Sequence, residues 1–310
     1  MPITADSSPG PIVVGVERSA RSRDALALGR MLARAAGTRL ILVAVYPLDA
    51  RSARMDRGAY ATALAEEAEA TLEWAGRPLS GVLATARAIP STSVARGLQQ
   101  LAEDEGALAI VVGPSHRGGL GRVVPGSVGE RLLHGAPCPV AVAPRGYWGV
   151  ADAAIRQIGL AYVNTPEAAE ALAAAVGLAT RTGAAIRARS VVQPGPVGAT
   201  GPFDWSYTEL EETTRDAVVR SLHRAVDNLD APVEISAEVV DGYADDELAR
   251  LSDEVDLLIC GSRGHGPVGR VVLSSVAAGV MRKARGPVLV VPRGAQDGFA
   301  ALLAPTTVAA

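Results

Sequence analysis

The chain has 310 residues, a length that favours two domains of ordinary size. Hydrophobic residues make up 48% and charged residues 20%, which excludes a disordered or fibrous chain. The 30 basic and 33 acidic residues leave a net charge of −3, so the chain lacks the basic excess of a nucleic-acid-binding protein, and we expect no nucleic-acid partner.

In chain order, the first half alternates short apolar runs with amphipathic segments. The apolar runs predict buried strands at Ile12–Val16, Leu40–Val45, Val82–Ala88, Leu108–Val112 and Val140–Ala143. Between them, two apolar stripes at helical spacing predict helices, the first with Ala25, Leu28, Leu32 and Ala36, the second with Leu64, Ala68, Leu72 and Ala75. Gly37 is typical of the residue after a helix. Further helices are predicted at Val94–Glu105 and Ser127–Leu133.

The second half repeats the first at an offset near 148 residues. CPVAVAPRG at Cys138–Gly146 returns as GPVLVVPRG at Gly286–Gly294, and IVVGPSHRGGLGRVVPGSV from Ile110 returns as LICGSRGHGPVGRVVLSSV from Leu258. IVVGVERS from Ile12 matches IGLAYVNT from Ile158. The corresponding strands are predicted at Ile158–Tyr162, Ile186–Val192, Val233–Val239, Leu257–Cys260 and Val288–Val291. A period this long indicates a duplicated domain and not a solenoid unit.

Strands that alternate with helices predict an α/β fold with a parallel sheet and helices on both faces. The expected organisation is a mobile tail at 1–11, a first domain at 12–146, a linker at 147–154, a second domain at 155–294 and a mobile tail at 295–310. The Gly- and Pro-rich segment Gly195–Asp204 is expected to be a loop.

Several other classes of protein are excluded. No apolar run approaches the roughly 18–20 residues of a membrane span, and the first ten residues lack the segments of a signal peptide, so we expect a cytoplasmic protein with no membrane partner. Cys138 and Cys260 are too far apart in sequence to predict a disulfide framework or a cysteine zinc site. Lys283 is the only lysine, and its surroundings do not match the P-loop pattern.

The loop after the fourth strand is the strongest candidate for a binding site. In open parallel sheets, ligands bind beyond the carboxyl ends of the strands, where strand order reverses. In the second half this loop contains Gly261, Arg263, Gly264 and Gly266, and Ser274–Ser275 opens the next helix. Glycines let a ligand approach backbone N–H groups, and a helix start adds further donors. These features predict a phosphate cradle that needs no lysine.

The pattern G-x-x-G, nine residues, then Gly or Ser, then Ser or Thr, followed by a helix and A-P-C-P-V, resembles the universal stress protein family in its tandem form. The resemblance implies, for each domain, a five-stranded parallel sheet of order 3-2-1-4-5, similar to adenine nucleotide α-hydrolases. It also implies ATP or another adenine nucleotide as the ligand, with Mg²⁺ as an optional companion.

The match to the family pattern differs between the halves. In the second half Gly261, Gly264 and Ser275 fit, Ser274 stands where Gly is more common, and Val163 replaces the aspartate that contacts adenosine. In the first half Gly113, Gly126 and Ser127 fit, Glu17 replaces that aspartate, and His116 replaces the second glycine. His116 would cost roughly 1–2 kcal/mol if the backbone there is left-handed, or its imidazole could contact a phosphate. Arg122 and Arg270 either face a triphosphate or are solvated.

Other chemistry has weaker support. Gly264–Gly269 matches G-x-G-x-x-G but follows a fourth strand, which disfavours a dinucleotide site. The four histidines lack the spacing of metal ligands, so no metal residue is assigned. No catalytic residue is assigned either, because only Glu17 and His116 stand near the phosphate loop as conceivable bases.

The leading hypothesis is therefore a tandem universal stress protein that binds adenine nucleotide and acts in stress response through regulated association with an unidentified protein partner. A scaffold of the same family that does not bind nucleotide, and a slow ATPase, remain alternatives. The uncharged strands Val140–Ala143 and Val288–Val291 would be sheet edges, which invite pairing, so we expect the two halves to pair through them. A homodimer is a further option.

Overall fold

The computed structural model describes residues 9–47, 58–76, 81–149, 154–163, 165–193, 204–229, 232–262 and 273–292. Three predicted site residues, Arg263, Gly264 and Gly266, lie outside these ranges. So do the C-terminal tail, the first eight residues of the N-terminal tail, and all but the last residue of the predicted loop at 195–204.

The first half contains five strands and four α-helices in the described part of the chain. The strands are β1 (Ile12–Gly15), β2 (Leu40–Pro47), β3 (Ala84–Ser91), β4 (Ala109–Val112) and β5 (Val140–Val142). The helices are α1 (Ala20–Ala36), α2 (Gly58–Gly76), α3 (Val94–Asp104) and α4 (Ser127–Leu132), and a 3-10 turn, η2, follows at Tyr147–Gly149. Gly37 ends α1 with a φ of 63°, in the left-handed region, as its position predicts.

The second half repeats this series. Its strands are β6 (Gln157–Ala161), β7 (Ala185–Val192), β8 (Ile235–Asp241), β9 (Leu257–Gly261) and β10 (Val288–Val291). Its helices are α5 (Pro166–Thr182), α6 (Asp204–Asp227), α7 (Ala244–Glu254) and α8 (Ser275–Lys283). None of the described helices is both long and apolar enough to cross a membrane.

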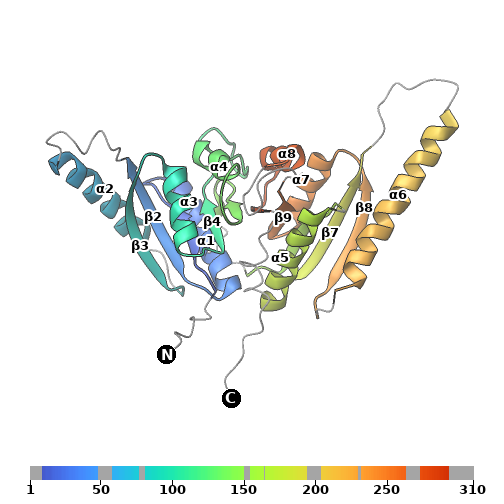
Figure 1. The fold of residues 1–310 in the computed structure, drawn as a ribbon, viewed down its shortest axis with the longest axis horizontal. Helices are drawn as coiled ribbons and strands as arrows, with labels where there is room; N and C mark the ends of the chain where they lie inside the picture. The colour runs from blue at the N-terminus through green and yellow to red at the C-terminus, as the bar shows by residue number, and fades with distance from the viewer. Residues whose placement is uncertain are drawn as a thin grey trace, which may run out of the picture.

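The ten strands form one sheet of order β3-β2-β1-β4-β5-β10-β9-β6-β7-β8 (Figure 1). Each half therefore has the predicted order 3-2-1-4-5 with parallel neighbours, and the fold class is confirmed. Strand order reverses between β1 and β4, and equivalently between β6 and β9. These are the points at which ligands bind in open α/β sheets.

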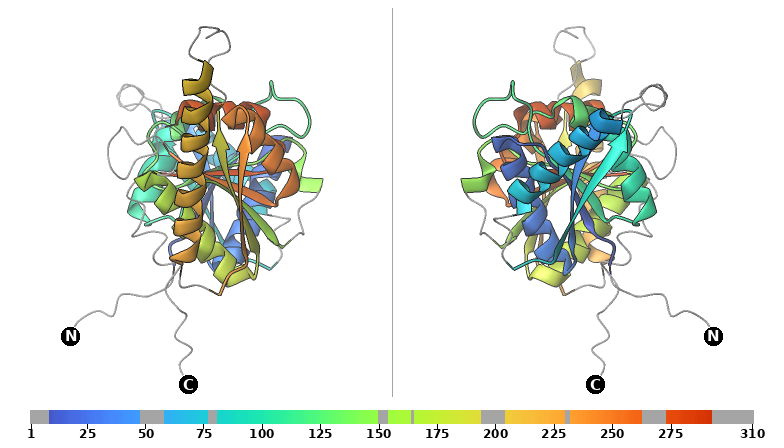
Figure 2. Two further views of the ribbon diagram at one scale, coloured as in Figure 1. Left: turned by 90° about the vertical axis from the view of Figure 1, so that its right-hand side faces the viewer. Right: turned by 90° about the vertical axis from the view of Figure 1, so that its left-hand side faces the viewer.

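Helices cover both faces of the sheet, as the views along its width show (Figure 2). Side chains alternate between the faces, so that Ile12 and Val14 join one core and Val13 joins the other. The first core includes buried residues of α1, α2 and α5 and continues to α6, and the second includes residues of α3, α4, α7 and α8. Both cores run through the two halves without a break.

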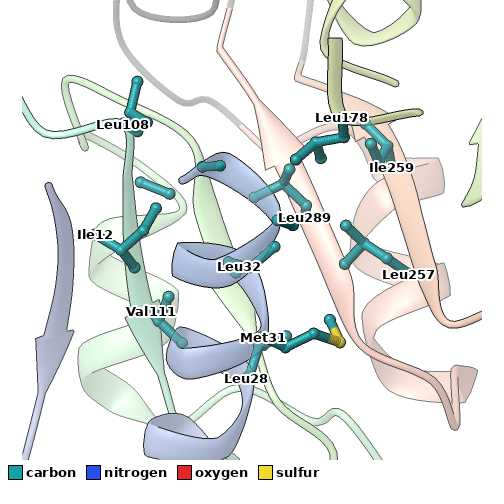
Figure 3. Packing of buried hydrophobic residues seen from close by; sticks show 14 of the residues in the cluster. Ile12, Leu28, Met31, Leu32, Leu108, Val111, Leu178, Leu257, Ile259 and Leu289 are labelled. Carbon is teal, nitrogen blue, oxygen red and sulfur yellow. The ribbon is translucent and has the colours of Figure 1, made fainter. Parts of the chain in front are cut away.

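The two halves join through an antiparallel pair of strands, β5 and β10, as predicted. Val140, Ala141 and Val142 stand opposite Val290, Leu289 and Val288. Because Ala141 and Leu289 are equivalent positions of the repeat, the pseudo-two-fold axis passes through this pair. Figure 3 shows Leu32 of α1 and Leu178 of α5 close to Leu289, where the residual cavity is only about 20 Å³. The junction is therefore a packed core.

Strand β2 of the first half and its counterpart β7 in the second half differ at one pair of equivalent positions. By strand register, Val43 of β2 corresponds to Arg189 of β7. Val43 is buried among apolar side chains, whereas Arg189 is buried with its Nε donating to Glu238 at 2.6 Å and its Nη1 donating to the Glu247 carbonyl at 2.9 Å. A charged guanidinium therefore joins β7 to α7, whereas the equivalent position of β2 packs into an apolar cluster.

Candidate functional site

A cavity of about 650 Å³ opens in the first half at the carboxyl ends of β1 and β4. It lies between α3 and the loop of residues 113–126 that joins β4 to α4, where strand order reverses. All five first-half residues predicted for the site line it: Glu17, Gly113, His116, Gly126 and Ser127. The volume falls within the usual range of small-molecule sites, about 300–1,000 Å³.

The start of the loop approaches α1 closely. A Cβ atom added to Gly113 would stand 2.4 Å from the carbonyl oxygen of Arg21, a distance that side chains do not adopt. Further along, Pro114 and Pro125 form an isolated bridge, and the Ser115 N–H donates to the Val124 carbonyl at 2.6 Å. Only glycine at position 113 lets the loop fold back on itself against the helix and wall the cavity.

Both apolar and polar side chains line the cavity. Valine and leucine side chains of the strand ends and of α3 contribute apolar surface: Val16, Val45, Val94, Leu98 and Val112. Polar side chains of the loop and of the first residue of α4 form a polar wall: Ser115, His116, Arg117 and Ser127. A ligand that has an apolar ring and an anionic group would find partners for both among these residues.

Glu17 stands two residues after β1 and contributes the only carboxylate at that end of the cavity among the described residues. Its carboxylate accepts hydrogen bonds from Arg21 Nε at 3.0 Å and from Ser19 Oγ at 2.9 Å. Its backbone N–H donates to Ser22 Oγ at 2.8 Å. The Glu17 side chain is 59% exposed, so it stands at the rim, already paired with Arg21.

His116 occupies the second glycine position of the family pattern without strain. No non-glycine residue in the described ranges has a positive φ, so the backbone at His116 is not left-handed and the conditional cost of roughly 1–2 kcal/mol does not arise. The loop satisfies its turns elsewhere, with Gly121 at a φ of 71°. The imidazole is exposed at the cavity wall, as the alternative of a direct phosphate contact requires.

The second-half counterparts lie around the end of β9 and the start of α8. Gly261 is the last residue of β9, and Ser275 is the exposed first residue of α8. Ser274 caps the helix, since its Oγ accepts the Ala277 N–H at 3.0 Å. Ser262 is buried, and its hydroxyl has no hydrogen-bond partner among the residues that the structure describes. Arg270 lies outside the described residues.

The family follows from the comparison with known proteins. The profile of the Universal stress protein family matches residues 10–144 and again residues 154–292. The chain belongs to the universal stress protein family. A universal stress protein of Mycobacterium tuberculosis strain H37Rv is 29% identical over 213 residues, which cover 64% of this chain and 69% of that protein.

Solved structures agree on the fold. A universal stress protein from Archaeoglobus fulgidus DSM 4304 matches with a TM-score of 0.67 and 20% identity, covering 94% of this chain and 100% of that one. A protein of unknown function from Pseudomonas aeruginosa PAO1 matches with a TM-score of 0.60 and 17% identity, covering 96% of each chain. At these identities the likeness shows the fold that this universal stress protein shares with them.

Sequence reasoning missed five polar side chains at the cavity: Arg21, Ser22, Ser115, Arg117 and Glu130. Arg21 had a detectable signal, because it stands four residues after Glu17 at the start of a helix, the usual spacing of a helical ion pair. Ser115 and Arg117 lie inside the loop, where no periodicity predicts side-chain direction. Ser115 Oγ accepts the Arg117 N–H at 3.2 Å, which orders this part of the loop.

Arg122 has neither of the two roles considered for it. It does not line the cavity, and its Nη1 donates to the carbonyl of Lys283 in the second half at 2.5 Å.

The described residues offer little support for cysteine or metal chemistry. Burial raises the pKa of the Cys260 thiol to about 12, which keeps it protonated at neutral pH. The described residues contain no cluster of three or more His, Cys, Asp or Glu side chains fit for a metal ion.

Proposed function

We propose that this universal stress protein binds an adenine nucleotide in the first-half cavity and acts in stress response through association regulated by that nucleotide. The observation that carries the proposal is the cavity at the β1–β4 switch point, whose lining combines apolar and polar side chains. The purine would lie against Val16, Val45 and Leu98, and the phosphates would lie against the loop.

The polar wall supports a phosphate ligand in particular. Arg117 and His116 supply cationic or hydrogen-bonding groups, and the Ser115 and Ser127 hydroxyls can each donate a hydrogen bond. Glu17 would face the ribose from the end of β1. To do so it would exchange its contact with Ser19 for one with a ribose hydroxyl, while Arg21 continues to neutralise its charge.

The slow ATPase has less support than binding. Glu17 is the carboxylate nearest to the role of a general base, but its oxygen already accepts hydrogen bonds from Arg21 and Ser19. A base committed to two donors is poorly placed to take a proton from water. A protein that binds a nucleotide without hydrolysing it rapidly can bind a protein partner to an extent that depends on the nucleotide concentration.

Titration calorimetry with ATP tests the proposal. We expect wild-type protein to release or absorb heat with a saturable isotherm, and absence of binding at millimolar ATP would leave the scaffold as the better hypothesis. Gly113→Ala should abolish or strongly weaken binding, because its Cβ would meet the Arg21 carbonyl. Gly119→Ala is the matched control, since its nearest atom would be Arg122 Cγ at 3.8 Å.

A milder variant guards against a folding defect in Gly113→Ala. Ser127→Ala removes one hydroxyl from the exposed first residue of α4 and should cost roughly 0.5–1.5 kcal/mol of binding free energy. Its thermal unfolding should match that of wild type. If Ser127→Ala binds ATP as tightly as wild type, the phosphates do not lie at the start of α4.

A further inference from the structure

The loop of residues 113–126 that walls the cavity is fastened to the other half of the molecule. Arg122 Nη1 donates to the Lys283 carbonyl at 2.5 Å, and the Val123 N–H donates to the Ala284 carbonyl at 3.2 Å. Both acceptors lie at the C-terminal end of α8. Val123 is fully buried, so this contact is part of the protein interior.

Arg145, just beyond β5, holds the same segment from its own half. The Gly121 N–H donates to the Arg145 carbonyl at 2.8 Å, and the Arg145 N–H donates to the Arg122 carbonyl at 2.9 Å. The Arg145 guanidinium also donates to the Gly118 carbonyl at 2.6 Å. The middle of the loop is therefore clamped between the end of β5 and α8.

The end of α8 is itself fixed. Lys283 Nζ forms ion pairs with Asp245 at 2.8 Å and with Asp246 at 2.7 Å, both in the first turn of α7. A Cβ on Gly279 would stand 2.5 Å from Asp245 Cβ, so α8 lies directly against α7. α4 and α8 lie at the same end of the molecule above the central strands, which places the clamp there (Figure 1).

The clamped segment stands between the two parts of the loop that line the cavity. Ser115, His116 and Arg117 precede it, and Gly126 and Ser127 follow it. Its glycines at 118, 119 and 121 give it little stiffness of its own. The conformation of the polar wall therefore depends on contacts supplied by the second half.

We propose that Arg122 is a positioning residue that couples the first-half nucleotide site to the seating of α8, so that the second half sets the affinity of the first. The inference rests on the proposed function, because the site it couples is the nucleotide site. Thermodynamic linkage requires the converse as well: nucleotide in the first half must strengthen the contact between the halves.

ATP affinity of full-length variants tests the coupling. Arg122→Ala should weaken ATP binding ~10-fold, in the range usual for coupled sites. Arg131→Ala is the matched control, because Arg131 is an exposed arginine on α4 that does not line the cavity, and it should change affinity less than about twofold. If wild type binds ATP and the two variants bind alike, the coupling is wrong while the proposed function stands. If wild type binds no ATP, the proposed function fails first and the inference with it.

A second measurement separates coupling from a local packing defect. ATP should slow hydrogen exchange of the Val142 and Val290 amides in wild type, and should not do so in Arg122→Ala. The double variant Asp245→Asn/Asp246→Asn removes the ion pairs of Lys283 without changing a residue that lines the cavity, and it should also weaken ATP binding. Combined with Arg122→Ala it should add little. Fully additive effects, or exchange that does not respond to ATP in wild type, would overturn the proposal.

Discussion

At the scale of single residues, the cavity depends on small groups in tight places and on charges that are already paired. Gly113 illustrates the first point, because a Cβ there would stand 2.4 Å from the Arg21 carbonyl oxygen. Glu17 illustrates the second, since its carboxylate at the rim already accepts a hydrogen bond from Arg21 Nε at 3.0 Å. Away from the cavity lining, the buried Asp24 carboxylate accepts the Gly146 N–H at 3.1 Å and the Trp148 N–H at 3.0 Å. It thereby ties α1 to η2.

Replacing His116 with glycine should not strengthen ATP binding. Because no strain exists to relieve, His116→Gly should bind ATP more weakly than wild type, through a lost imidazole and a loop with more freedom to lose. His116→Ala should lie between the two, since alanine restricts the backbone but lacks the ring. If calorimetry shows that His116→Gly binds ATP more tightly than wild type, this order is wrong. His134→Ala, an exposed histidine after α4, is the control.

Asp24 should make stability depend on pH in a defined direction. Burial raises the pKa of its carboxyl above the ordinary value of 3.8, partly offset by the hydrogen bonds from Trp148 and Gly146. Between the unfolded and folded pKa values the folded chain holds more protons, so the stability contributed by Asp24 falls as pH rises through that window. Urea unfolding of wild type and Asp24→Asn should therefore show a difference that shrinks with rising pH.

At the scale of elements, the bounds of strands buried on both faces were predictable from the sequence, and the bounds of edge strands were less so. β10 is observed at its predicted bounds, because its apolar run has definite ends. β3 was expected at 82–88 and lies at Ala84–Ser91, since an exposed edge strand has little apolar patterning to mark where it starts. The strand order within each half was implied by the family resemblance, and the repeat predicted only that both halves share one order. The loop of residues 113–126 was predictable as a site but not in its anchorage, because Arg122 meets a carbonyl 161 positions away across the pseudo-two-fold axis.

The two serines at the start of α8 should contribute differently to the free energy of unfolding, because one caps the helix and the other lies at the surface. Ser274→Ala removes the acceptor for the Ala277 N–H and should lower the free energy of unfolding by ~1 kcal/mol. Ser275→Ala, at the next and exposed position, should leave stability unchanged. Equal losses in urea unfolding would show that the Ser274 cap contributes nothing specific.

At the scale of the whole molecule, the two halves behave as a dimer within one chain. β5 and β10 pair at the centre, and Arg181 Nη1 on α5 donates to the Ala36 carbonyl at the end of α1, 3.1 Å away. Together with the contact of Arg122 on α8, these interactions join the halves at the sheet, at the ends of α1 and α5, and at the cavity loop. Rigid joining at three places favours unfolding as one unit.

Val290→Lys should loosen this junction. Val290 is fully buried opposite Val140, so an unpaired ammonium there should cost several kcal/mol unless it neutralises or escapes to water. Faster hydrogen exchange of the β5 amides and a lower unfolding midpoint are the expected readouts. Val163→Lys, at a site that is 63% exposed, should change neither. If β5 amides of wild type exchange as fast as loop amides, the pairing does not persist in solution.

The replacement of Val43 by Arg189 at equivalent positions of the repeat has a consequence for how such a protein can evolve. In a homodimer of identical chains, every substitution enters both subunits, so a charged layer beneath one site would appear beneath the other. Duplication within one chain removes this restriction. One copy can then keep apolar side chains at this position while the other acquires charged ones, and each copy can change independently of the other.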